Sequence, residues 1–231
     1  MPTGTDTGAS DALLHLLWLA SPALPVGGFS YSEGLEAAVD AGVVHDEASA
    51  AEWLLNQLAL VQARGELPVV AAAHQAALAG DAERLAALNA WVLQTREASE
   101  SLQQTQQMGR SLLVWLQGLV PEAPVLPLLQ ALAPAPTWPV VMGCATATRG
   151  AALAPALQAI AFGWAENLTQ AAVRGVPLGQ TAGQRLLAQL VQAIPAAVQT
   201  ALEASEPMAF APMLGIHAAR HEIQYSRLFR S

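Results

Sequence analysis

The sequence contains no lysine, and this absence excludes two kinds of chemistry. All ten of its basic side chains are arginines. A phosphate-binding loop of the Walker type needs a lysine that reaches the nucleotide phosphates, so the chain is not itself an NTPase of that class. A Schiff base with a carbonyl substrate also needs a lysine amine.

Charge and cysteine are scarce as well. Charged residues make up 12% of the 231 residues, the formal net charge is -8, and 53% of the residues are hydrophobic. This composition supports one substantial core, and the acidic balance argues against general nucleic-acid binding. Cys144 is the only cysteine, so no internal disulfide forms, which fits a reducing, cytoplasmic compartment. Its apolar neighbours predict a buried, inert thiol.

Signals for export or membrane insertion are missing too. Residues 1–10 have neither a basic start nor an apolar signal core, and they predict a short disordered tail. The region between Glu122 and Arg149 is uncharged, but a spanning helix needs about 20 continuous apolar residues. Five prolines interrupt it, at Pro124, Pro127, Pro134, Pro136 and Pro139. The sequence therefore predicts no contact with a membrane.

Strong helix formers fill most of the chain, which favours an all-α fold. We expect a single-domain bundle of about ten helices with little or no β-structure, and residues 139–142 are the best strand candidate. The expected organisation is a tail at 1–10, a helical domain at 11–212 and a C-terminal partner-binding segment at 213–231. The expected helices cover 11–19, 32–41, a third after Asp46, a fourth from Pro68, 82–104, 105–119, 125–132, 140–148, 153–173, 180–203 and 213–226.

Residues 19–36, here called the proline–glycine segment, differ from an ordinary linker. Pro22 and Pro25 fix φ and remove two backbone donors, and the glycines at 27 and 28 permit backbone angles closed to other residues. Ser30 and Glu33 have the spacing of a capping box, which predicts a helix start, as Thr181 and Gln184 do later. The pattern is typical of a rigid surface loop. Phe29 and Tyr31 are either wedges that hold the loop or exposed contacts.

Three groups of residues resemble functional sites, and each also has a simpler structural explanation. The Gly28–Ser32 stretch is similar to a nucleophile elbow around Ser30, but no strand precedes it and the last glycine is missing. His217 and His221 are spaced i, i+4, so both could bind one metal, although a polar helix face or an interface is the favoured explanation. The charged side chains around the Gln-rich stretch 94–107 suggest either a solvated helix face or a docking face.

The C-terminus combines arginines with aromatic residues, which is the composition of interface anchors. Arg220, Arg227 and Arg230 flank Tyr225 and the pair Leu228–Phe229. A chain end is otherwise frayed and polar. Either a partner covers Phe229, or the side chain packs on the protein's own core.

Several blocks of residues resemble the urease accessory protein UreF family. They are the proline–glycine segment with its Ser-Pro-x-Leu-Pro-Val-Gly-x-Phe-Ser-Tyr-Ser-x-Gly-Leu-Glu pattern, residues 167–187, and the terminus from Arg220 to Ser231. Residues 103–111 add a weaker fourth block. The blocks extend over nearly the whole chain.

The resemblance implies a non-catalytic, all-α, cytoplasmic protein that forms a homodimer and needs no cofactor. It implies a chaperone or scaffold that links the UreD (or UreH) partner and the GTPase UreG to apo-urease during assembly of the dinuclear nickel centre. The implied UreD-side residues are Arg220, His221, Tyr225, Ser226, Arg227, Leu228, Phe229 and Arg230. The implied UreG-side residues are Pro25, Gly27, Phe29, Ser30, Tyr31, Glu33 and Glu36.

Two further hypotheses come from the residues themselves. The alternative function is a nickel-binding carrier that uses His217 and His221. A hydrolase that uses Ser30 has the least support, because no base accompanies the serine.

Overall fold

A computed structural model describes residues 7–231 and shows helices joined by loops, with no strand in that range. The predicted all-α class is therefore confirmed, and the strand candidate at 139–142 lies inside a helix. The elements are α1 (Thr7–Ala20), η1 (Gly28–Ser30), α2 (Leu35–Asp40), α3 (Glu47–Gln57), η2 (Leu58–Glu66), α4 (Leu67–Ala79), α5 (Ala82–Thr95), α6 (Ser99–Leu119), α7 (Leu126–Gln130), α8 (Trp138–Ala147), α9 (Leu153–Gly175), α10 (Gln180–Glu203) and α11 (Pro212–Glu222).

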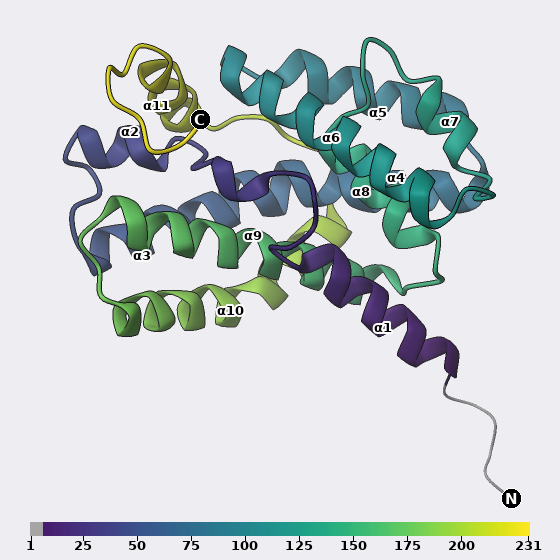
Figure 1. The fold of residues 1–231 in the computed structure, drawn as a ribbon, viewed down its shortest axis with the longest axis horizontal. Coiled ribbons are helices and arrows are strands. Elements are labelled where there is room, and N and C mark those ends of the chain that lie inside the picture. Colours follow the sequence, from purple (N-terminus) through teal and green to yellow (C-terminus); the bar gives the residue numbers. More distant parts are fainter. Residues whose placement is uncertain (1–6) are drawn as a thin grey trace, which may run out of the picture.

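The core forms where α4 packs on α8 and α9 packs on α10 (Figure 1). Gly143 allows the first contact, because a Cβ there would collide with the backbone carbonyl of Val70. Cys144 lies in the same contact and is fully buried, and burial raises the pKa of its thiol to about 12. The predicted burial of this thiol is thus confirmed.

The two ends of the chain are placed differently. Helix α1 packs on α9 and extends from one end of the molecule, whereas α11 packs on α2 and α6 at the other (Figure 1). Helix α1 begins at Thr7 and not at Asp11, so residues 7–10 of the predicted tail are helical, and residues 1–6 lie outside the described residues. Within residues 7–231, no helix is long and apolar enough to cross a membrane.

Some helix starts predicted from the sequence are found in the structure, and others are not. Asp46 caps α3, and Ser49 completes the box in return. The capping box expected from Thr181 is absent, because Gly179 occupies the N-cap of α10. The single helix predicted at 82–104 is two helices, because the backbone of Arg96 is extended and ends α5. The chain then turns, and α6 begins at Ser99.

Helices α3, η2 and α4 follow one another without a loop, and η2 is a π-helix. Pro68 occupies the first turn of α4, as predicted. Because proline has no N–H, it cannot donate to the carbonyl of Arg64 four residues earlier. The backbone N–H of Met208 donates to that carbonyl instead, at 2.8 Å. This bond anchors residues 204–211, here called the strap, across the π-helix.

Candidate partner-binding surface

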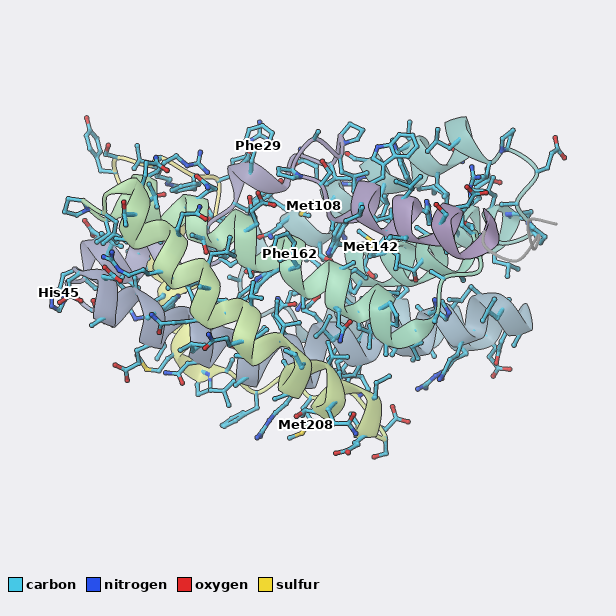
Figure 2. The ribbon with its side chains drawn as sticks, turned by 90° about the horizontal axis from the view of Figure 1, so that it is seen from below. Phe29, His45, Met108, Met142, Phe162 and Met208 are labelled. Carbon is cyan, nitrogen blue, oxygen red and sulfur yellow. The ribbon has the colours of Figure 1, made fainter. Side chains whose placement is uncertain are left out.

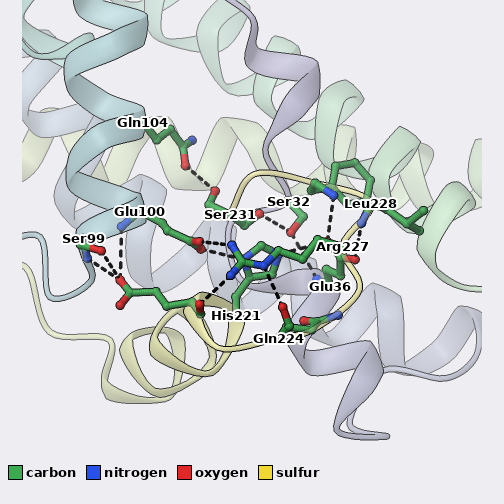
Figure 3. Close-up of polar contacts among 12 residues, drawn as sticks. Ser32, Glu36, Ser99, Glu100, Gln104, His221, Gln224, Arg227, Leu228 and Ser231 are labelled. Atoms are coloured by element: carbon green, nitrogen blue, oxygen red, sulfur yellow. Dashed lines mark hydrogen bonds and ion pairs between the residues drawn. The ribbon is translucent and has the colours of Figure 1, made fainter.

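Residues 223–231, here called the terminal loop, fold back onto α2 through one buried carboxylate (Figure 3). Glu36 is 7% exposed. Its Oε1 accepts the backbone N–H of Leu228 at 2.6 Å, and its Oε2 accepts that of Phe229 at 2.9 Å. Hydrogen bonds to an ionised acceptor are stronger than neutral ones. A single side chain therefore fixes two consecutive backbone N–H groups of the loop.

His221 is buried between two carboxylates of different helices. Its Nε2 lies 3.0 Å from Oε2 of Glu36 on α2, and its Nδ1 lies 2.6 Å from Oε2 of Glu100 on α6. An imidazole donates from both nitrogens only when it is protonated. The ring of His221 therefore joins α11 to α2 and α6 at once.

Arginine and glutamate complete this network. Arg227 donates to Oε1 of Glu100 at 2.5 Å and to the backbone carbonyl of Glu222. The carboxylate of Glu222 accepts the backbone N–H and the hydroxyl of Ser99, at 2.6 and 2.7 Å. Since Ala98 at the N-cap of α6 has no side-chain oxygen, Glu222 supplies the missing cap from another helix.

Phe229 is buried, whereas its neighbours in the terminal loop are exposed. The guanidinium of Arg174 lies 4.7 Å from the centre of the Phe229 ring, and the side chain is 6% exposed. The protein's own core therefore covers it, and no partner is required for that. Ile223, Tyr225 and Leu228 are 85%, 105% and 70% exposed. Arg220, Ser226 and Arg230 are also exposed.

The proline–glycine segment separates its two aromatic rings. Phe29 is 60% exposed, whereas Tyr31 is 4% exposed and donates its hydroxyl to Oε1 of Gln107 at 2.9 Å. Phe29 is therefore the exposed ring of the two, and Tyr31 is the buried ring that holds the loop in place. Gly27 has a left-handed backbone, with φ 75°, which explains a glycine there. Pro25 is exposed and Ser30 is half-buried.

The predicted capping box of Ser30 and Glu33 does not form. Glu33 has φ 51°, and α2 begins only at Leu35, with Gly34 as its N-cap. The Glu33 carboxylate instead accepts the indole N–H of Trp164 at 2.9 Å and the amide of Gln104 at 3.2 Å. Glu33 therefore belongs to the interior and Phe29 to the surface.

The two sets of predicted site residues adjoin each other in the structure. The N–H of Arg230 donates to the carbonyl of Ser30 at 2.8 Å, and the N–H of Ser32 donates to the carbonyl of Ser231 at 2.7 Å. Glu36 belongs to the proline–glycine segment and anchors the terminal loop. The segment and the loop consequently form one continuous surface, with Phe29 on one part and Tyr225 on the other.

His217 and His221 do not form the metal pair that their spacing suggests. Both nitrogens of His221 are engaged by carboxylates. His217 is fully buried with neither ring nitrogen hydrogen-bonded, and its ring meets Trp53 edge-on at 5.2 Å. Burial lowers the pKa of His217, and the nearby charge of Arg220 lowers it further. Among residues 7–231, no three histidine, cysteine or acidic side chains are grouped to hold a metal ion.

Sequence reasoning missed several residues of this surface. Ser32, Glu100, Gln104 and Arg174 hold the terminal loop, and Glu222 caps α6. Ser32, Gln104, Arg174 and Glu222 lie within the blocks that carry the family resemblance, and the charged stretch 94–107 was the signal for Glu100, which contacts the chain's own terminal loop. The interpretation of this stretch as a solvated face is therefore wrong at Glu100, whose side chain is 13% exposed.

Residues 7–231 therefore define an all-α protein whose candidate site is a surface of exposed apolar side chains on buried supports. The sequence profile of the UreF family matches residues 44–191. The urease accessory protein UreF of Methylibium petroleiphilum is 58% identical over 100% of this chain and 96% of its own length. The UreF of Paracidovorax citrulli is 57% identical over 95% of this chain and 89% of its own length.

A fused relative also matches. The bifunctional urease accessory protein UreEF of Bordetella bronchiseptica is 46% identical over 100% of this chain, which covers 54% of that protein. These matches show that the chain belongs to the urease accessory protein UreF family, whose members are accessory proteins and not enzymes.

Proposed function

We propose that the protein is a scaffold in urease maturation, which binds the UreD (or UreH) partner and the GTPase UreG and presents them to apo-urease while the dinuclear nickel centre is assembled. The observation that carries the proposal is the continuous surface of the proline–glycine segment and the terminal loop. Its anchors are buried, and its apolar side chains point outward. Apolar side chains on a rigid support are typical of interface anchors.

The terminal loop is the proposed UreD-side contact. Tyr225 and Leu228 are exposed, whereas the groups that shape the loop are buried beneath them. Aromatic and arginine side chains dominate the binding energy of many interfaces. Arg230 in the terminal loop and Arg220 on α11 are exposed cations.

Phe29 and its neighbours form the proposed UreG-side contact. The 3-10 turn η1 raises Phe29 above the surface, and Asn167 and Arg174 hold the turn through the carbonyls of Gly28 and Phe29, at 3.1 and 3.2 Å. A side chain presented from a fixed backbone binds with little loss of entropy. The proposed homodimer would carry two copies of this surface.

The test is a pulldown of UreD with the double variant Tyr225→Ala/Leu228→Ala. We expect binding to fall about tenfold or more, because two exposed anchors are removed and the buried network remains. Leu78→Ala, at an equally exposed position on α4, is the matched control. Undiminished capture of UreD by the double variant would refute the assignment of the terminal loop.

A further inference from the structure

A cavity of about 230 Å³ lies beneath the strap, between the π-helix η2 and helices α5, α6, α8 and α9. Three tryptophans contribute to its apolar lining, at positions 91, 138 and 164. Met108 and Met142 line it near the centre of the molecule, and Met208 lies at the edge of the molecule (Figure 2). Ligand sites are concave and mostly apolar, with a few polar groups. An empty cavity of about 150 Å³ already accepts benzene in another protein.

The charged groups of this lining are mostly acidic. Glu33, Glu66 and Glu97 line the cavity together with one cation, Arg96. Arg96 forms an ion pair with Glu66 at 2.6 Å. Glu33 accepts hydrogen bonds from two neutral groups, the indole of Trp164 and the amide of Gln104, and it forms no ion pair within residues 7–231.

Burial raises the pKa of Glu33, because the charged form loses its water, and this effect exceeds the opposing hydrogen bonds from Trp164 and Gln104 and the charge of Arg96. The charge of Glu66 adds to the rise. A carboxylate in such a place is stabilised by any cation that binds beside it. The cavity therefore combines an aromatic, apolar wall with an acidic group that has no ionic partner.

The backbone at this acid is unusual. Glu33 is a non-glycine residue with positive φ, at 51°, a conformation that is uncommon and costs free energy. The opposite wall is a π-helix, and π-helical turns are frequent at functional sites. Both features place side chains toward the cavity at some cost in stability. Gly65 of that wall lies so close to the strap that a Cβ would come 2.9 Å from the carbonyl of Met208.

We propose that this cavity binds a small organic ammonium ion, with its apolar body among the tryptophans and its charged group donating to Glu33. Tryptophan faces attract cations, and a desolvated ammonium gains most from them. A charge-assisted hydrogen bond to Glu33 adds direction. The cavity adjoins the partner-binding surface, because Glu33 and other residues of the proline–glycine segment line it, but the proposal does not depend on the scaffold function.

The first test compares three probes of similar shape on the intact protein, by ligand-observed NMR and tryptophan fluorescence at pH 7. Benzylamine is protonated, whereas benzyl alcohol and toluene are neutral. We expect benzylamine to bind about tenfold more tightly than either neutral probe, since a hydrogen bond to a charged group contributes about 1.5–3 kcal/mol. Equal affinities for all three, or saturable binding of none, would overturn the proposal.

The second test uses Glu33→Gln, which keeps the side-chain length and removes the charge. Its affinity for benzylamine should fall to that of the neutral probes, with toluene binding unchanged. Glu83→Gln, at an exposed carboxylate on α5, is the matched control and should keep the preference. Competition of benzylamine by Ni²⁺ at equal or lower concentration would instead indicate a metal site and contradict an ammonium site.

Discussion

The proline–glycine segment and the terminal loop share one surface but are held in place by different physics. The segment takes much of its shape from its own backbone, with left-handed glycines at 27 and 34 and a 3-10 turn between them, and neutral or surface side chains such as Asn167 and Arg174 then hold that turn. The terminal loop takes its shape from side chains far away in the sequence, above all Glu36 and Glu100. Local backbone angles thus contribute more to the segment, and long-range ionic contacts contribute more to the loop.

This difference determines how each element responds to change. A backbone conformation fails only when the residue that permits it is replaced. A network of buried charges fails as a unit, because removing one member leaves the others desolvated and unpaired. We therefore expect the terminal loop to be the more fragile element, and the following variants test that comparison.

The largest effect is expected from Glu36→Ala. The variant leaves two backbone N–H groups and one nitrogen of His221 without an acceptor. Loss of one partner from a buried pair costs about 3–5 kcal/mol, measured here as the free energy of unfolding in urea. The terminal loop should also become sensitive to limited proteolysis. Glu52→Ala, at an exposed carboxylate of α3, should change stability by less than about 0.5 kcal/mol. Unchanged stability and protease resistance in Glu36→Ala would show that the network does not hold the loop.

The same comparison explains what the sequence could predict. Asp46, the prolines and the apolar spacing of the helices are local signals, and they led to the all-α class and to most helices. Residues 19–36 were recognisable as a shaped loop for the same reason. Tyr31 and Phe29 could not be separated, because the inward position of Tyr31 involves Gln107, which lies 76 residues away in the sequence.

Predictions failed where a distant group replaced a local one. Ser30 and Glu33 have the spacing of a capping box, yet Trp164 and Gln104 hold the Glu33 carboxylate in the interior. Likewise, Glu222 is unremarkable in the sequence until it caps α6 from α11. No local pattern contains such partners.

A smaller effect is expected from Gly34→Ala, which tests the backbone side of the comparison. Gly34 has φ 78°, and a Cβ there would lie 3.1 Å from Cδ1 of Leu214. A left-handed alanine costs about 1–2 kcal/mol, read again by urea unfolding. Gly179→Ala, with φ -75° and open space around the new Cβ, is the control and should be nearly neutral. A neutral Gly34→Ala would mean that the segment does not depend on its backbone angles.

The variant His217→Leu tests the buried packing of α11 and leaves the ionic contacts of His221 on the same helix in place. Because burial lowers the pKa of His217, the unfolded chain binds this proton more readily, and stability falls as the pH drops below the unfolded value of about 6.5. The variant should lose less stability between pH 7 and pH 5, by at most about 1.4 kcal/mol per pH unit. His15 and His74, whose pKa values burial also lowers, would maintain a residual slope. His45→Leu, at an exposed histidine, should leave the slope as it is, and a slope unaltered by His217→Leu would contradict this account.

The smallest effect on stability is expected from Phe29→Ala, which addresses the function of the shared surface. The ring is 60% exposed, so its removal should change the free energy of unfolding by less than about 0.5 kcal/mol. Capture of UreG should nevertheless weaken by about fivefold or more, since truncation of an anchor costs more than about 1 kcal/mol. Capture of UreD should stay close to normal, in contrast to Tyr225→Ala. If Phe29→Ala weakened the capture of UreG and UreD equally, the segment and the loop would act as one binding site. The separate assignments of UreG to the segment and UreD to the loop would then have to be merged.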